Sequence, residues 1–156
     1  MGEVFAWGLA VVLAGILVSA GIEDVRHREI ANWKNAAIAL LAPAWWVAIG
    51  LPMWPGMAIQ LGLALLVFAL FAAAFAAGMM GGGDVKMIAA LALWFPLHSL
   101  LWLLVVMSLV GGAITLVMLV DHRRRRISEQ PEIPYGVAIA CAALLTLSEP
   151  VFNHFG

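Results

Sequence analysis

Long apolar runs, separated by short polar or Pro/Gly-rich breaks, fill most of this 156-residue chain. A bilayer core of about 30 Å takes about 20 apolar residues as a helix. We therefore expect an all-α protein, a polytopic membrane helical bundle that forms a single domain over residues 1–156. The sequence predicts about six transmembrane helices, namely Val4–Ile22, Asn35–Gly50, Met57–Ala77, Val85–Phe95, Leu97–Val120 and Pro134–Glu149.

Composition excludes a soluble domain. The chain is 65% hydrophobic and 11% charged, with a mean hydropathy of +1.04, whereas soluble domains are about half apolar and about a quarter charged. The net charge of −1 gives no indication of nucleic-acid binding. The single cysteine, Cys141, can form neither a disulfide framework nor a Cys-based zinc site.

The basic residues indicate how the helices are oriented. All 8 Lys and Arg residues fall in the first, third and fifth breaks, which six alternating crossings bring to one side. Because Lys and Arg gather on the cytoplasmic side, both termini are expected to face outward (N-out/C-out). Glu3 precedes the first run and Arg26 and Arg28 follow it, so we expect a retained span rather than a cleaved signal.

Two carboxylates, Asp24 and Asp84, stand at the same predicted membrane edge on different spans. Asp84 follows Gly81–Gly83 and precedes the run Val85–Phe95, which gives only about 16 Å of helix. This helix is therefore expected to begin inside the membrane, with the glycines as non-helical backbone in close approach to another segment. An ionisable residue at that depth is a candidate for function.

Each aspartate also has an ordinary explanation. Asp84 can cap the helix that follows it, and Asp24 can be an interfacial charge beside Arg26 and Arg28. Two carboxylates that share a proton can instead activate water, because the ionised one accepts a proton while the neutral one donates to a carbonyl oxygen. That chemistry needs the first and fourth helices to pack side by side, which periodicity does not establish.

Three segments resemble type IV prepilin peptidases, a family of GxGD membrane aspartyl proteases. GGGDVKMIAAL (81–91) is similar to the GxGD signature itself. DVRHREIAN (24–32) is similar to the family's D-x-R…I-P-N segment, with Ala31 where the family usually has proline. IPYGVAIA (133–140) is similar to the Pro-Tyr/Phe-Gly stretch that opens its last helix. The resemblance is closest to the short TadV- or CpaA-like branch that processes Flp/Tad-type pilins.

The resemblance implies an aspartic endopeptidase that removes the leader of type IV prepilins at the cytoplasmic face of the bacterial inner membrane. Asp24 and Asp84 take the catalytic positions, and neither a metal nor an organic cofactor is expected. N-methyltransferase activity is not expected, because the CxxC-bearing segment of larger relatives is lacking. The implied partners are a prepilin with a basic leader and a transmembrane helix, and the lipid bilayer. Supporting positions are Gly81, Gly83, Lys86, Asn32, Pro134, Tyr135 and Gly136.

Other charged residues have simpler expected roles. The run Arg123–Arg126 is expected to fix the topology and contact anionic lipids. Asp84, at a helix N-terminus near Lys86, is expected to be the ionised base, with Asp24 as the acid. Candidates to receive the basic side chains of a leader are Glu23, Glu29, Glu129 and Glu132.

Other functions remain open at this stage. An ion- or proton-coupled transport protein can use Asp24 and Asp84 as carriers, but the outer half of the chain has few polar side chains for a path. A catalytically silent assembly factor for a pilus or secretion system would keep the same fold. A preflagellin-type peptidase would share the chemistry and differ in substrate. The polar residues available for a path are Ser19, Gln60, Ser108 and Thr115.

Overall fold

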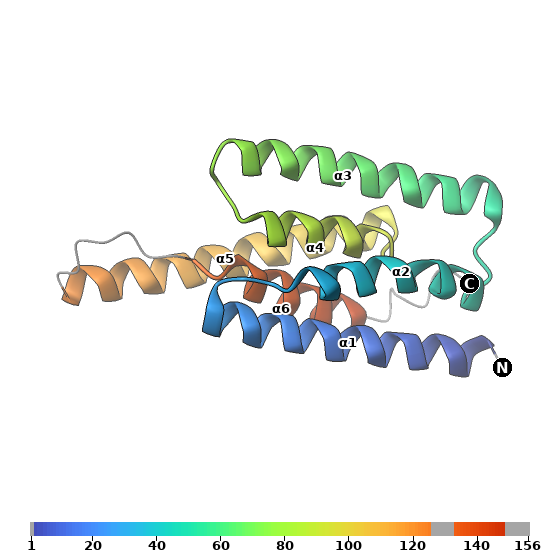
Figure 1. Ribbon diagram of the computed structural model, residues 1–156, viewed down its shortest axis with the longest axis horizontal. Coiled ribbons are helices and arrows are strands. Elements are labelled where there is room, and N and C mark those ends of the chain that lie inside the picture. The colour runs from blue at the N-terminus through green and yellow to red at the C-terminus, as the bar shows by residue number, and fades with distance from the viewer. Residues whose placement is uncertain (1, 126–132, 149–156) are drawn as a thin grey trace.

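The computed structural model describes residues 2–125 and 133–148, and the regular structure in these ranges is helical. The predicted all-α membrane bundle is confirmed (Figure 1). The elements are α1 (Gly2–His27), α2 (Asn32–Ala48), the kinked turn η1 (Met53–Met57), α3 (Ala58–Ala76), α4 (Gly82–Ala92), α5 (Leu97–Arg125) and α6 (Tyr135–Ser148).

Helices of two lengths make up the described part of the chain. Gly2–His27, Met53–Ala76 and Leu97–Arg125 are long and apolar enough to span a bilayer, judged by length and composition. The helices α2, α4 and α6 are shorter, with 17, 11 and 14 residues. The short helices contain many of the buried side chains, so they form the interior of the bundle.

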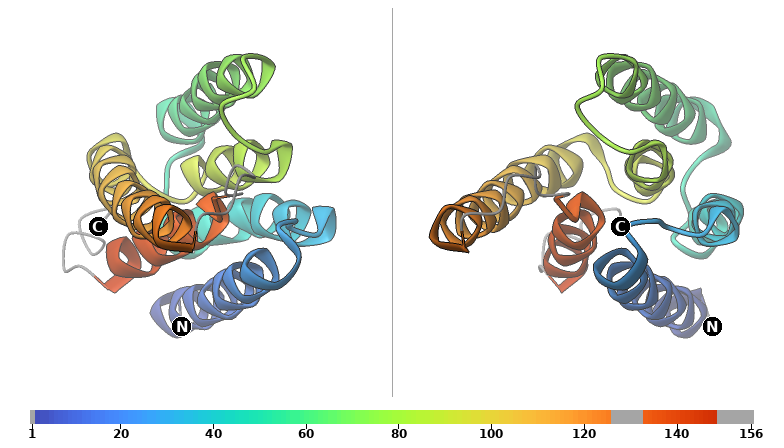
Figure 2. Two further views of the ribbon diagram at one scale, coloured as in Figure 1. Left: turned by 90° about the vertical axis from the view of Figure 1, so that its left-hand side faces the viewer. Right: turned by 60° about the vertical axis from the view of Figure 1, so that its left-hand side comes forward.

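Four inner helices, α1, α2, α4 and α6, are flanked by α3 and α5. α4 packs against α2, α3 and α6, whereas α6 packs against α1, α4 and α5. α1 also contacts α2, which closes the inner group. The end-on views in Figure 2 show α3 outside α4 and α5 outside α6.

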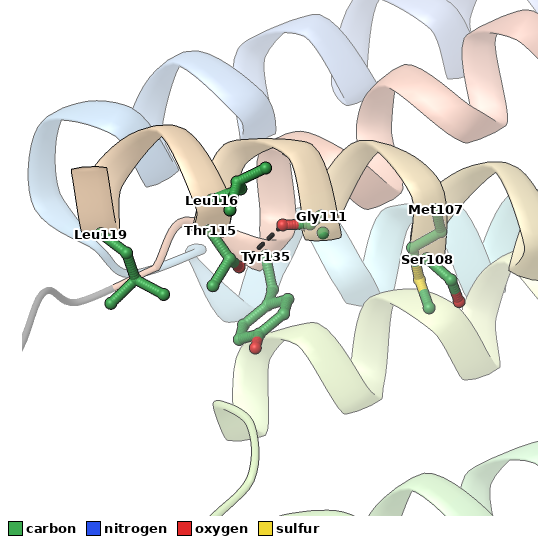
Figure 3. A pocket seen from close by; sticks show the side chains of 8 residues that line it. Met107, Ser108, Gly111, Thr115, Leu116, Leu119 and Tyr135 are labelled. Atoms are coloured by element: carbon green, nitrogen blue, oxygen red, sulfur yellow. Dashed lines mark hydrogen bonds between the residues drawn. The ribbon is translucent and has the colours of Figure 1, made fainter. Parts of the chain in front are cut away.

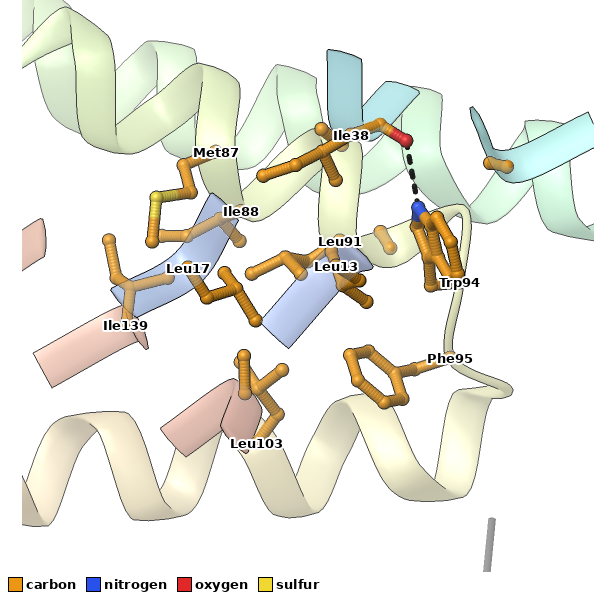
Figure 4. Packing of buried hydrophobic residues seen from close by; sticks show 14 of the residues in the cluster. Leu13, Leu17, Ile38, Met87, Ile88, Leu91, Trp94, Phe95, Leu103 and Ile139 are labelled. Carbon is orange, nitrogen blue, oxygen red and sulfur yellow. Dashed lines mark hydrogen bonds between the residues drawn. The ribbon is translucent and has the colours of Figure 1, made fainter. Parts of the chain in front are cut away.

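The core is a set of fully buried apolar side chains where the inner helices meet (Figure 4). Trp94, just after α4, donates its indole N–H to the Ile38 carbonyl at 2.8 Å and stacks on Trp45 with ring centroids 5.4 Å apart. Because lipid tails are as apolar as these side chains, packing and interhelical hydrogen bonds hold the bundle together. Labelled core residues are Leu13, Leu17, Ile38, Met87, Ile88, Leu91, Trp94, Phe95, Leu103 and Ile139.

One end of the bundle carries the basic residues. The C-terminal ends of α1, α3 and α5 and the N-terminal ends of α2, α4 and α6 all point toward the left of Figure 1. The basic residues in the described ranges therefore gather at that end, as alternating crossings require. They are Arg26, Arg28, Lys34, Lys86, Arg123, Arg124 and Arg125.

The helix boundaries at this end differ from the predicted ones. α1 continues through Asp24 to His27, because Arg26 and His27 complement the negative end of a helix, and Arg28 with φ +56° ends it. Asp24 therefore lies in the last turn of α1.

The predicted start of α4 is wrong. The helix begins at Gly82, so Gly82 and Gly83 are helical and Gly81, with φ −76° and ψ 150°, is the N-cap. Asp84 lies in the first turn rather than at the cap. The helix ends at Ala92, before Phe95, whose position in front of Pro96 disfavours helical backbone.

Candidate active site

A cleft of about 820 Å³ opens at the basic end of the bundle. Its walls come from the end of α1, the loop into α2, the α3–α4 loop and the first turns of α4 and α6. Asp24 and Asp84 both line it, the first from α1 and the second from α4. The structure thus brings the two sequence-predicted carboxylates into one cavity.

Asp24 is buried where α1 meets the start of α6. The residue is 5% exposed, and its Oδ2 accepts the backbone N–H of Val137 at 3.1 Å. Val137 is in the first turn of α6, and helix N-termini carry free N–H groups that favour a carboxylate. Arg28, which also lines the cleft, adds a positive charge close enough to act on Asp24.

Asp84 is 9% exposed and lines the same cleft from the first turn of α4. Its carboxylate has a backbone hydrogen bond with Gly81, the residue that caps α4. This is one half of a capping box, in which a first-turn side chain is bonded to the backbone of the N-cap residue; the other half is missing because Gly81 has no side chain. Asp24 lies close enough for its charge to act on Asp84, so ionisation of Asp24 disfavours the ionised form of Asp84.

Gly136 is the closest backbone approach at the site. A Cβ at this position would lie 2.7 Å from Ile30 Cδ1 and 2.9 Å from both Cγ and Oδ2 of Asp24. Ile30 also lies against Gly83, where an added Cβ would be 3.5 Å from Ile30 Cβ. Ile30 therefore packs against the backbone beside each aspartate.

The sequence predicts a close backbone approach at Gly81–Gly83, whereas the structure has its closest approach at Gly136. Beside Gly82 and Gly83 an added Cβ would make only ordinary contacts, at 3.5 Å. Gly81 is tighter, because its Cβ would lie 3.2 Å from Asp84 Oδ2. Sequence inspection favoured the triplet because glycines in a row are conspicuous, whereas Gly136 becomes crowded only when α6 packs on α1.

Lys86 does not pair with Asp84 within the described ranges. Its Nζ donates to Asn32 Oδ1 at 2.9 Å, so these two predicted supporting residues contact each other on the exposed side of α2 and α4. The N-terminus of α6, meanwhile, lies against Asp24. The structure therefore removes Lys86 as a ground for treating Asp84 as the stabilised carboxylate, and it shows that Asp24 also lies at a helix N-terminus, that of α6.

The remaining predicted residues have different surroundings. Pro134 is buried, and Tyr135 is half-buried and lines the cleft. Glu23 is already engaged, since its Oε2 lies 2.8 Å from Lys34 Nζ and accepts the Ala31 N–H at 3.1 Å. Glu29 is exposed and lines the cleft. Glu129 and Glu132 lie outside the described residues.

A second cavity of about 390 Å³ lies along α5 beside the start of α6 (Figure 3). Tyr135 lines both this cavity and the cleft. The hydroxyls of Ser108 and Thr115 donate to the carbonyls of Leu104 and Gly111, each at 2.8 Å, so they are satisfied within their own helix. The second cavity is consequently apolar in character.

Sequence reasoning missed several residues around the aspartates. Ile30 is a large apolar residue directly after the four polar residues 26–29, and that contrast is a signal that could have identified it. Lys34 and Asn35 are buried polar side chains at the start of an apolar helix, a second usable signal. Within the described ranges, no group of three His, Cys, Asp or Glu side chains is arranged to hold a metal ion.

The contacts of Gly83 lead to a stability prediction. Replacing Gly83 by alanine adds a methyl group at ordinary contact distance from Ile30 and removes a glycine from a helix, which favours the helix by about 1 kcal/mol. The melting temperature of Gly83→Ala should stay the same or rise by about 2–4 °C, as thermal unfolding in detergent would measure. A lowered melting temperature would contradict the ordinary packing described at this position.

Comparison with known proteins adds one match. The profile described as the Type IV leader peptidase family matches residues 11–116 of the chain. The matched range contains Asp24, Asp84 and the loop segments that line the cleft on either side of them. No curated protein and no solved structure matches the chain.

Proposed function

Because the chain belongs to the Type IV leader peptidase family, we propose that it is an aspartic endopeptidase with Asp24 and Asp84 as its catalytic pair. The observation that carries the proposal is the cleft itself, which two buried carboxylates line from separate helices. The family supports a leader peptidase in general, and the carboxylate pair supports the aspartic mechanism.

The proposed chemistry uses one proton shared by the two carboxylates. The ionised member accepts a proton from water while the protonated member donates a hydrogen bond to the carbonyl oxygen of the scissile peptide bond. The hydroxide attacks the carbonyl carbon, and collapse of the tetrahedral intermediate breaks the C–N bond as the amine takes up the proton that the carboxylate had accepted from water. Burial of both carboxylates supports this, since coupling between like charges is stronger away from water.

The proposed substrate is a type IV prepilin of the Flp/Tad type, with a basic leader and a transmembrane helix. The proposed location is the bacterial inner membrane, with the cleft facing the cytoplasm, supported by the basic residues that gather at that end of the bundle. Glu29, exposed on the cleft, is the proposed contact for a leader lysine or arginine. A preflagellin-type substrate would use the same pair.

The bonding of the sparse polar residues favours a peptidase over an ion-coupled transporter. Gln60 donates to the carbonyls of Ala92 and Phe95, and the hydroxyls of Ser108 and Thr115 bond within α5. Among the residues that the structure describes, these three side chains are used in packing, which leaves few polar groups for a path to the other end of the bundle.

Reconstitution tests the proposed function. The purified protein in liposomes should cut a Flp-type prepilin once, between leader and mature pilin, and mass spectrometry should find the new N-terminus unmethylated. The same liposomes should show no ion flux above that of empty vesicles. Intact prepilin together with ion flux would support transport, and intact prepilin without flux would support an inactive assembly factor.

A further inference from the structure

The start of α2 is bonded to both helices that carry the aspartates. Lys34 Nζ lies 2.8 Å from Glu23 Oε2 on α1, and Asn35 Nδ2 donates to the Gly83 carbonyl on α4 at 3.1 Å. Glu23 immediately precedes Asp24, and Gly83 immediately precedes Asp84. Adjacent residues of α2 thus bond the side chain of the residue before Asp24 and the backbone of the residue before Asp84.

The ammonium group of Lys34 is bonded to α1 and is largely shielded from solvent. Its side chain is only 6% exposed, and its Nζ also donates to the Ser19 carbonyl at 3.0 Å, one turn before Glu23. A buried ammonium group is costly unless it is paired and hydrogen-bonded, and here both conditions are met by α1. Glu23 in turn accepts the Ala31 N–H, so the loop into α2 is tied to the same carboxylate.

Asn35 makes the corresponding link to α4. It is 4% exposed, and its Nδ2 donates across to Gly83, whereas its Oδ1 has no hydrogen-bond partner within the described residues. Leaving a buried amide oxygen unpaired costs stability. An apolar residue would avoid that cost, so the side chain at this position is best explained by its bond to α4.

We propose that Lys34 and Asn35 are positioning residues that set the spacing between Asp24 and Asp84, an inference that rests on the proposed function of that pair. We call these two residues the α2 clasp. Lys34 and Asn35 are consecutive residues of α2, so the clasp fixes α1 and α4 to one rigid segment of that helix. Loss of either bond frees one carboxylate to move relative to the other.

Kinetics of Lys34→Met and Asn35→Leu test the clasp. Each variant should lower kcat by about 10- to 100-fold with little change in KM, because displacement of about 1 Å is enough for such a loss. The two limbs of the pH–rate profile should move closer together, since more distant carboxylates are less strongly coupled. Other titratable groups on the cleft, His27, Arg28, Glu29 and Tyr135, are identical in all variants.

The double variant adds a second criterion. Lys34→Met/Asn35→Leu should be about as slow as the slower single variant. Breaking either bond already allows the distance between Asp24 and Asp84 to change, so breaking the second adds little. Lys34→Arg keeps the positive charge, so the two limbs of its pH–rate profile should fall at the same pH values as in the wild type. If Lys34→Met does not fold, Lys34→Gln, which retains a donor but not the charge, serves in its place. Lower rates with unmoved limbs, or losses that multiply in the double variant, would overturn the proposal.

Gln60→Leu is the matched control. Gln60 also donates from a buried amide to the backbone of α4, at the Ala92 carbonyl 3.1 Å away, but at the opposite end of that helix. It should lower the melting temperature without moving either limb of the pH–rate profile. If Asn35 had a structural role alone, Asn35→Leu would likewise lower the melting temperature and leave both limbs of the pH–rate profile unmoved.

Cross-linking measures the spacing without catalysis. In an Asp24→Cys/Asp84→Cys/Cys141→Ser protein, a short bifunctional thiol reagent should bridge the two cysteines. The yield should fall when Lys34→Met or Asn35→Leu is added and hold when Gln60→Leu is added. An unchanged yield would refute the clasp even if the protein cleaves prepilin, whereas a wild type that cleaves nothing would refute the proposed function and leave this readout intact.

Discussion

Asp24→Asn and Asp84→Asn should each lower the rate of leader cleavage by about 10²- to 10⁴-fold. An asparagine oxygen can still accept the Val137 N–H that Asp24 accepts, so the helices should pack as before. An amide, however, can neither take a proton from water nor share one with the other carboxylate. The double variant should be no slower than the single ones, because the two residues act as a unit.

Asp121→Asn is the control for this experiment. Asp121 is exposed on α5 and pairs with Arg125 at 2.9 Å, a surface contact worth about 0.3–0.5 kcal/mol within a helix. The same chemical change should leave cleavage and folding unaltered there. Cleavage at the wild-type rate by either Asp24→Asn or Asp84→Asn would remove that residue from the catalytic pair.

Gly136→Ala should reduce cleavage by about 10²-fold or more while the protein still folds. The new Cβ would lie 2.7 Å from Ile30 Cδ1, which can rotate away, and 2.9 Å from Asp24 Cγ, which cannot do so without losing the Val137 N–H. Overpacking of this kind costs about 1–3 kcal/mol in stability. The larger effect should therefore be on kcat, through displacement of Asp24.

Gly21→Ala is the matched control, because Gly21 faces α6 from α1 at ordinary distance, 3.4 Å from Ala140 Cβ. It should retain near-normal cleavage. Adding Ile30→Val to Gly136→Ala should recover stability and not activity, since the crowding of Asp24 remains. Wild-type cleavage by Gly136→Ala, or recovery of cleavage by Ile30→Val, would show that Asp24 is not the group displaced.

The helices were predictable because the signals for them are local. Apolar runs, their lengths and the sorting of Lys and Arg determine how many helices form and which ends lie together. Boundaries were less predictable, since α1 continues through charged residues that suit its C-terminal end and α4 begins within the glycines. Both shifts depend on backbone hydrogen bonding that residue type alone does not determine.

The aspartates could be identified from sequence, but their surroundings could not. Asp24 and Asp84 lie at motif positions. The helix whose N-terminus donates a hydrogen bond to Asp24, however, is α6, and the donor Val137 is more than a hundred residues later in the chain. The crowding at Gly136 and the two bonds of the α2 clasp likewise arise only from packing between helices. The sequence also predicted that Lys86 acts on Asp84, whereas in the structure its Nζ donates to Asn32.

A titration followed by NMR of protein labelled with ¹³C at aspartate carboxyl carbons tests the shared proton most directly. The aspartates of this chain are Asp24, Asp84 and Asp121, so the spectrum is simple and Asp121 is an internal reference. The Asp24 and Asp84 carbons should each shift in two common steps, and Asp84→Asn should leave Asp24 with one. Two independent single-step titrations, unaffected by replacing the other aspartate, would contradict a pair that shares one proton.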